Sequence, residues 1–193
     1  MRYSAQHKQE TRERIVHTAS RHFRRRGGNG VGIADLMSKL KLTHGGFYKH
    51  FASKEELLTE AILKAFEETE AQLMEAVAKA QPGNELKMII DHYLDLDHCG
   101  NPDGGCPVAA LASEIGRYPR AVRLEINKAM RNRTRKLARF LPGRTDAERE
   151  RNCLVLISGM VGAVSLARAT LDAERRKMIL NAARDFYLQA FCN

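Results

Sequence analysis

Apolar residues recur every three to four positions along almost the whole chain, and no run shows the alternation of a β-strand. This pattern predicts an all-α protein. Glycine- and proline-containing breaks such as "RRRGGNG" and "QPGN" separate the periodic segments. About nine helices are expected, over residues 6–26, 33–40, 43–51, 53–80, 84–97, 107–117, 119–141, 146–170 and 172–191.

Polar residues at the predicted helix starts support these boundaries. Thr43 stands where an N-cap is expected before the third helix. The pairs Ser53–Glu56 and Thr145–Glu148 have the spacing of a capping box, in which each side chain satisfies the other residue's backbone N–H. The fourth and eighth predicted helices therefore begin at defined positions.

Positive charge is concentrated at the start of the chain. Residues 1–55 hold twelve Lys and Arg against four Asp and Glu, whereas the remaining residues hold twenty against nineteen. An unusually basic solvated face is one interpretation of this imbalance. Its confinement to one segment favours a nucleic-acid-binding module attached to a near-neutral body.

The cysteines and apolar runs indicate a cytoplasmic location. Four cysteines occur in a chain whose first residues are charged and carry no apolar leader, which favours reduced thiols. The longest apolar run, "CLVLISGMVGAVSLA", is too short and too rich in small residues for a membrane span. No membrane partner is therefore expected.

The stretch "VGIADLMSKLKLTHGGFYKHFASKEEL" predicts a helix-turn-helix, because two short helices joined by a tight turn lie inside the basic segment. The first helix would pack through Ile33, Leu36 and Leu40, and the second would lie in the major groove of DNA. Gly45 and Gly46 each cost that helix roughly 1 kcal/mol relative to alanine. The missing side chains would allow its backbone to approach DNA closely.

The same stretch resembles the TetR/AcrR family of bacterial transcriptional repressors. The resemblance covers residues 11–58 and rests on Leu42, Thr43, Gly45, Phe47, Tyr48, His50, Phe51, Ser53, Lys54, Glu55 and Leu57. It implies a three-helix DNA-binding head over residues 1–52 and an effector-binding and dimerisation domain over residues 53–193. Two positions depart from the family pattern: Lys41 replaces the usual glycine of the turn, and Gly32 replaces a Ser/Thr cap.

The resemblance also implies roles for individual residues. Phosphate contacts are expected from Thr43, Tyr48, His50 and Lys54, and contacts at or near base edges from His44, Gly45, Gly46, Phe47 and Lys49. Less specific interpretations remain open. Phe47 and Phe51 also suit the core of the head, Tyr48 and His50 suit a partly exposed surface, and the run 24–26 of arginines suits either a solvated helix end or a DNA contact.

For the body, the resemblance implies a homodimer on a palindromic operator, released when a small-molecule effector of unknown identity binds. The last two helices would form the interface, unless they are ordinary core, through Ser158, Gly159, Gly162, Ala163, Ala167, Ile179, Ala182, Ala183, Phe186 and Ala190. The middle helices would enclose the effector. Their apolar residues fit plain packing equally well, so the sequence assigns no pocket lining.

The stretch "DHCGNPDGGCPVAAL" admits three interpretations. Cys106 falls at an N-cap with Pro107 at the first helical position, where the helix dipole favours a thiolate. It is then either a small residue that fits a helix start or a sensing thiol, alone or with Cys99. A metal site or thiol enzyme using His92 or His98 with these cysteines is the alternative, but no CxxC pair or third orienting group is present. We therefore expect no enzyme, metal or cofactor.

Overall fold

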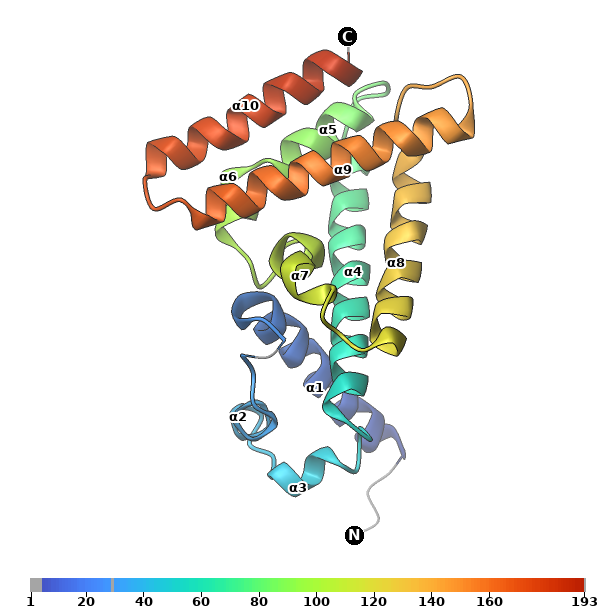
Figure 1. Ribbon diagram of the computed structural model, residues 1–193. Helices are drawn as coiled ribbons and strands as arrows, with labels where there is room; N and C mark the ends of the chain where they lie inside the picture. Colours follow the sequence, from blue (N-terminus) through green and yellow to red (C-terminus); the bar gives the residue numbers. More distant parts are fainter. Residues whose placement is uncertain (1–4, 29, 193) are drawn as a thin grey trace.

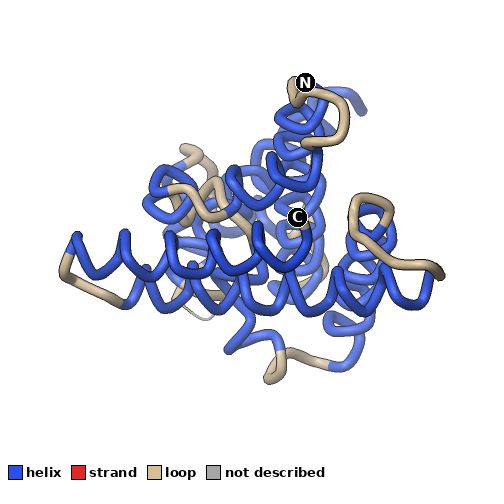
Figure 2. Tube along the Cα trace, turned by 90° about the horizontal axis from the view of Figure 1, so that it is seen from above, coloured by secondary structure: helices blue, strands red, loops and turns tan. Residues whose placement is uncertain are grey.

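The computed structural model describes residues 5–28 and 30–192, and over these ranges the chain consists of helices and loops without a β-strand (Figures 1 and 2). The ten helices are α1 (Ala5–Arg26), α2 (Ile33–Lys39), α3 (His44–Phe47), α4 (Lys54–Ala78), α5 (Glu85–Tyr93), α6 (Leu96–Gly100), α7 (Pro107–Ile115), α8 (Arg120–Ala138), α9 (Asp146–Ala169) and α10 (Ala173–Phe191). The predicted all-α fold class is confirmed.

The helices form a small N-terminal group and a larger body. Helices α1 to α3 lie together at one end of the molecule, and α4 runs from α3 through the body to α5 (Figure 1). Helix α8 lies alongside α4, and α9 and α10 pack on each other at the end far from α3. The long helix α4 is therefore a direct connection between the two ends.

Two apolar cores stabilise this arrangement. One contains α1, α2, α3 and the first half of α4, and it continues into α7 and α8 through Leu111, Val122 and Ile126. The other lies between the second half of α4, α5, α8, α9 and α10. Since the first core includes side chains from both sides of residue 52, the head is packed against the body rather than hanging from a linker.

The helix predicted over 84–97 is interrupted in the structure. Helix α5 ends at Tyr93, and α6 begins at Leu96 because the Asp95 side chain accepts a hydrogen bond from the Asp97 N–H at 2.7 Å. An Asp at this position caps a new helix and competes with continuation of the old one. The segment expected to be a loop from residue 97 therefore begins with a short helix.

One capping box is complete and the other is rearranged. Thr145 and Glu148 form both reciprocal bonds at the start of α9, as predicted. At the start of α4, Ser53 accepts from the Glu56 N–H at 3.2 Å, but the Glu56 carboxylate accepts from the Ala52 N–H at 2.6 Å. The same carboxylate pairs with Arg12 at 2.9 Å, so α4 is tied to α1 as well as capped.

Arg24 is neither a solvated helix end nor a DNA contact, which corrects both interpretations of this residue. It is 4% exposed, and its Nη1 donates to the Gly105 carbonyl at 2.9 Å while its Nη2 lies 3.3 Å from a carboxylate oxygen of Glu68. Desolvation lowers the pKa of Arg24, partly offset by Glu68. This side chain therefore connects α1 of the head to α4 and to the loop before α7.

Helix α9 is longer than its apolar run suggests. Within the part of the chain that the structure describes, it has an 18-residue window that is apolar enough, by length and composition alone, to cross a membrane. Only 28% of that window is buried within the chain, although α9 packs against α8 and α10. An exposed apolar surface of this kind is typical of an interaction site.

Candidate nucleic-acid interface and effector cavity

Helices α2 and α3 are joined by the tight turn that the sequence predicts. Thr43 is the N-cap of α3, as expected, and its hydroxyl oxygen accepts from the Gly46 N–H at 3.2 Å. This leaves the hydroxyl hydrogen available for an outside acceptor. Gly32 is the N-cap of α2, and no side chain makes a cap hydrogen bond at this helix start.

Lys41 holds a left-handed conformation, with φ of 56°, as its place in the turn predicts. A non-glycine residue pays roughly 1–2 kcal/mol for this conformation. The turn around it is closed by a bond from the Leu42 N–H to the Met37 carbonyl at 2.9 Å. The strain is therefore held by the backbone of the turn itself.

Several predicted DNA-contacting side chains are exposed together on α3 and its flanks. Thr43, His44 and Lys49 are exposed, and Tyr48 is exposed over 61% of its surface. A Cβ added at Gly45 would meet no atom within 4 Å, so this side of α3 is open to a close approach. Gly46 faces inward, where a Cβ would lie 3.3 Å from the Thr43 hydroxyl.

The prediction that the Phe47 side chain contacts base edges is wrong. It is 0% exposed, and its ring stacks on Phe51 with centroids 5.4 Å apart. Both rings fill the core between α1, α3 and α4, which is the alternative that the sequence left open. The family pattern at this position reports packing of the head and not readout of DNA.

His50 lies in a basic hollow of about 600 Å³ between the start of α1 and α3, lined also by Lys8, Lys41 and Lys49. Burial lowers the pKa of His50, and the positive charges of Lys8, Arg12 and Lys49 lower it further. Its Nδ1 is buried and has no hydrogen-bond partner in residues 5–28 and 30–192. Lys54 is the first residue of α4 and directly follows the Ser53 cap.

A cavity of about 310 Å³ lies in the body between α4, α5, α8 and α9. Its lining is mainly apolar and consists of Phe66, Leu73, Ile89, Tyr93, Cys106, Val108, Met130, Arg133, Thr134, Leu137, Leu154, Ile157, Ser158, Met160 and Val161. A small hollow of about 20 Å³ lies beside this cavity, and Tyr93, Cys106 and Arg133 line both. His98 and Gly104 line this small hollow and also a surface cleft of about 470 Å³. The size and lining suit a small organic ligand.

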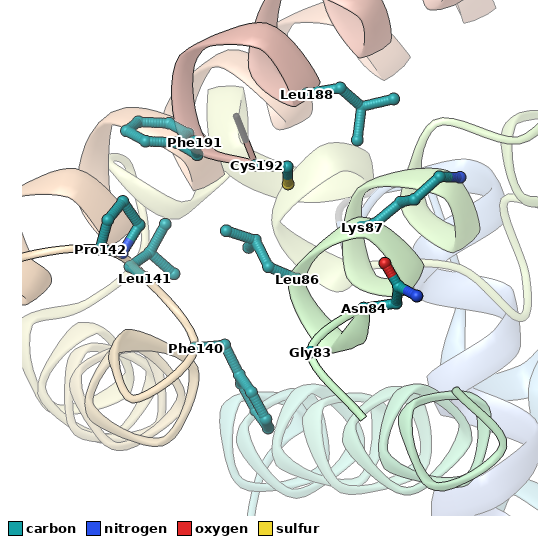
Figure 3. A pocket seen from close by; sticks show the side chains of 10 residues that line it. All are labelled: Gly83, Asn84, Leu86, Lys87, Phe140, Leu141, Pro142, Leu188, Phe191 and Cys192. Atoms are coloured by element: carbon teal, nitrogen blue, oxygen red, sulfur yellow. The ribbon is translucent and has the colours of Figure 1, made fainter. Parts of the chain in front are cut away.

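A second hollow is more open and lies at the far end of the body (Figure 3). It has about 560 Å³ and is lined by Gly83, Asn84, Leu86, Lys87, Phe140, Leu141, Pro142, Leu188, Phe191 and Cys192. The side chains labelled in Figure 3 are mostly apolar, and Lys87 is paired with Asp91. None of the buried polar atoms found without a partner in the described ranges lines this groove.

The loop before α7 is built around His98. Its Nδ1 lies 2.6 Å from the Tyr93 carbonyl and its Nε2 lies 3.2 Å from the Cys106 backbone nitrogen. The first contact fixes the Nδ1–H tautomer, so Nε2 accepts from the Cys106 N–H. Since both ring nitrogens are engaged, the interpretation of His98 as a metal ligand or catalytic base is not favoured.

Cys106 is the N-cap of α7 with Pro107 at the first position, as predicted, and it is buried. Cys99 is buried as well, and both cysteines are free thiols. In residues 5–28 and 30–192, no group of three His, Cys, Asp or Glu side chains is arranged to hold a metal ion. Cys106 nevertheless lines the cavity, so a small molecule inside it would meet this thiol.

Protonation of His98 is expected to destabilise the fold. Burial lowers the pKa of His98 from 6.5 to about 4, so the folded state favours the neutral ring. Stability is then fully present above the unfolded-state pKa and is lost as the pH falls from 6.5 toward 4, by about 2 kcal/mol at pH 5. Urea unfolding of the wild type and of His98→Gln at pH 7 and pH 5 measures this.

The Gln variant should lose less stability between the two pH values, because its side chain does not titrate. His22 and His50, whose pKa values are also lowered by burial, remain in both proteins and cancel in the comparison. Equal losses in the two proteins would contradict the assignment of a neutral His98 to the folded state.

The last two helices divide their small residues between an inner and an outer face. Ala167 is buried in the core, and a Cβ at Gly159 would collide with the Tyr187 hydroxyl, so these two residues serve packing within the chain and are corrected as interface residues. Gly162, Ala182, Phe186 and Ala190 are exposed. The exposed large apolar residues that accompany them are Leu154, Val155, Leu166 and Met178.

Comparisons with known proteins agree with this architecture. The family model described as "Bacterial regulatory proteins, tetR family" matches residues 15–61, which include α2, α3 and the start of α4. An uncharacterised HTH-type transcriptional regulator of Mycobacterium tuberculosis, Rv0196, is 29% identical over 93% of this chain and 95% of its own. Another, YxaF of Bacillus subtilis, is 28% identical over 84% of this chain and 87% of its own.

A solved TetR transcriptional regulator from Chloroflexus aurantiacus extends the likeness to the whole fold. It has a TM-score of 0.78 and 26% identity, over 95% of this chain and 97% of that one. The family model, the curated relatives and the solved structures all support a transcriptional regulator of the TetR family. TetR-family regulators are DNA-binding proteins that bind operator DNA and generally act as dimers.

No buried role was expected for Arg24 from the sequence, and Arg133 was not singled out. Arg133 lies three residues after Met130 and four before Leu137, so it occupies the apolar stripe of α8. A cation inside such a stripe signals a buried charge, and the structure confirms the burial. In α1, Arg24 also follows a buried apolar residue, Phe23. This indication of a buried cation is weaker, because Arg24 belongs to the run 24–26 at the end of the helix, where arginines are usually solvated.

Proposed function

We propose that this TetR-family regulator is a repressor that binds a palindromic operator as a homodimer and leaves it when a small molecule enters the body. The observation that carries the proposal is the joint exposure of Thr43, His44, Tyr48 and Lys49 around the open face of Gly45. Thr43, Tyr48, His50 and Lys54 would hold phosphates and fix the register, while His44, Gly45, Gly46 and Lys49 would lie against base edges. Residues 1–52 would be the DNA-binding unit.

The dimer would form through the exposed apolar face of α9 and α10. Leu154, Val155, Leu166, Met178 and Phe186 are large apolar side chains that water surrounds in the single chain. A symmetric four-helix contact would bury them and would account for the apolar surface of α9 without a membrane. Phe186→Glu should then shift the protein from dimer to monomer in sedimentation, whereas Asn181→Asp, an exposed position about 140° around the same helix from Phe186, should not.

DNA binding tests the central part of the proposal. The wild type should bind the DNA upstream of its own gene, and an excess of scrambled DNA should not compete. Lys54→Gln should weaken binding and reduce the slope of log affinity against log salt by about 1.8, because a bound dimer loses one phosphate contact from each protomer. Lys79→Gln, the same charge change at the other end of α4, should leave the slope unchanged. The absence of any sequence-specific binding by the wild type would overturn the proposal.

Release would follow from a ligand that prefers the spacing of the two heads that does not fit DNA. Helix α4 lines the cavity with Phe66 and Leu73 and begins beside the DNA-binding face at Lys54. Modification of Cys106 by a reagent that enters the cavity is a second route to release, with Cys99 as a neighbouring thiol. A Cys106→Ser protein that still leaves DNA normally after oxidant treatment would exclude the thiol route.

A further inference from the structure

The cavity contains a cation without a counter-ion. Arg133 is 9% exposed, and in residues 5–28 and 30–192 no carboxylate oxygen lies within 4.0 Å of its guanidinium group. Its hydrogen bond is donated by Nη1 to the Thr69 hydroxyl at 3.1 Å. Buried charges in proteins are normally paired, as Arg24 is with Glu68 in this chain. An anion is therefore the partner that Arg133 lacks.

The Tyr93 hydroxyl places a hydrogen-bond donor in the same cavity lining as Arg133. This hydroxyl is buried, and in the described part of the chain the polar group beside it is the Cys106 thiol, a weak acceptor that does not reach hydrogen-bond geometry. Burial raises the pKa of Tyr93 well above its ordinary value, and the neighbouring Cys106 thiol raises it further, so the phenol stays protonated. Thr69 uses its hydroxyl hydrogen for the Ala65 carbonyl at 2.8 Å. The Tyr93 hydroxyl and the Arg133 guanidinium group are therefore both available to a ligand in the cavity.

The rest of the cavity favours an apolar body attached to that anion. The side chains that face it from α4, α8 and α9 include Phe66, Leu73, Met130, Leu137, Ile157 and Val161. A volume of about 310 Å³ is at the small end of ligand cavities and has room for one chain or ring system. A single arginine matches the two oxygens of a carboxylate in a bidentate contact.

We propose that the cavity binds an organic monoanion, a carboxylate on an apolar body, whose carboxylate accepts from Arg133 and from the Tyr93 hydroxyl. This assignment rests on the proposed function, since it names the chemical class of the effector for the same cavity. The bound body contacts α4, which leads to the DNA-binding face, and α9, which carries the proposed dimer surface. One molecule in this position therefore contacts both elements that set the spacing of the heads.

Calorimetric titration of the full chain with decanoate and with 1-decanol tests the charge requirement. The two probes share one apolar body and differ in the head group. Decanoate is expected to bind at least about tenfold more tightly, because a hydrogen-bonded ion pair adds a charge-assisted contact. Arg133→Met should remove this preference while 1-decanol binds as before, and Arg131→Met, an exposed arginine on the same helix, should keep it.

Two further measurements keep the result interpretable. The ligand-free Arg133→Met protein should melt at a higher temperature than the wild type, since an apolar side chain replaces an unpaired buried charge. Tyr93→Phe should fold normally and weaken decanoate about threefold to tenfold, while 1-decanol should be unaffected. The melting temperature therefore separates loss of a ligand contact from loss of the fold.

Equal affinities for the two probes in the wild type would overturn the proposal, and so would a decanoate affinity weaker than about 1 mM. A preference for decanoate that survives Arg133→Met would also overturn it. These titrations contain no DNA. A protein that prefers decanoate through Arg133 but binds no operator would contradict the proposed function and support the anion site. A protein that binds an operator but shows no preference for decanoate would contradict the anion site and support the proposed function.

Discussion

Truncation of Phe47 to alanine is expected to destabilise the protein by about 3–5 kcal/mol and to unfold the head under conditions in which the wild type is folded. The ring is completely buried and stacks on Phe51, so its removal leaves a cavity between α1, α3 and α4. Urea unfolding at a fixed protein concentration measures the loss, because dimerisation would link stability to concentration. Helix α3 has only four residues and little stability apart from this packing.

Tyr48→Ala is the matched control, since it truncates the next aromatic side chain along the chain. Tyr48 is mostly exposed, so its stability change should stay below about 1 kcal/mol. Its DNA affinity should fall nevertheless, because the proposed phosphate contact is lost. A Phe47→Ala protein that keeps wild-type stability and loses only DNA affinity would show that the ring is a DNA contact after all.

Replacement of Arg24 by methionine is expected to cost about 3 kcal/mol of stability. The methionine keeps the apolar contacts of the side chain but leaves the Gly105 carbonyl without its donor and Glu68 without this cation. Because Arg24 joins α1 to the loop before α7, the variant should also weaken the effect of an effector on DNA binding. Urea unfolding measures the first effect, and DNA affinity with and without effector measures the second.

Arg25→Met tests whether burial or charge is responsible. Arg25 is exposed and lies 3.5 Å from Asp103, so its loss should change stability by less than about 1 kcal/mol. Equal losses for the two arginine variants would argue against Arg24 as the buried connection. The loop that receives Arg24 is also held from α9, where Arg168 donates to the carbonyls of His98 and Cys99 at 3.1 Å and 3.0 Å.

This loop explains why "DHCGNPDGGCPVAAL" was ambiguous as a sequence. It touches the head through Arg24, touches α9 through Arg168, and contributes Cys106 to the cavity. Its histidine and cysteines are residue types that also build metal and thiol sites. The His98 ring in fact bonds to backbone groups of Tyr93 and Cys106, and the carbonyls of Gly105 and His98 accept from Arg24 and Arg168, which lie 81 and 70 positions away along the chain. No local pattern reveals the two distant contacts.

The local features were determined by the sequence because they depend on neighbours a few residues apart. Helical periodicity predicts nine segments that each contain a helix, but the segment 84–97 is interrupted at Asp95, and the helix expected over 43–51 ends at Phe47. The caps at Thr43 and Thr145 and the left-handed turn at Lys41 also depend on local backbone geometry, and they were predicted. The family pattern around α3 is equally short in range, which is why the head was identified without tertiary information.

Burial and charge pairing were decided only by the tertiary structure. Arg24, Arg25 and Arg26 are identical letters in a row, yet the approach of Gly105 and Glu68 buries the first of them. Phe47 and Tyr48 are adjacent aromatics, and only the packing of α1 and α4 makes one of them core and leaves the other exposed. Arg133 became a candidate anion ligand because α4, α8 and α9 close around it without a carboxylate. The free energy of a charge depends on every group within a few ångströms, and distant helices supply those groups.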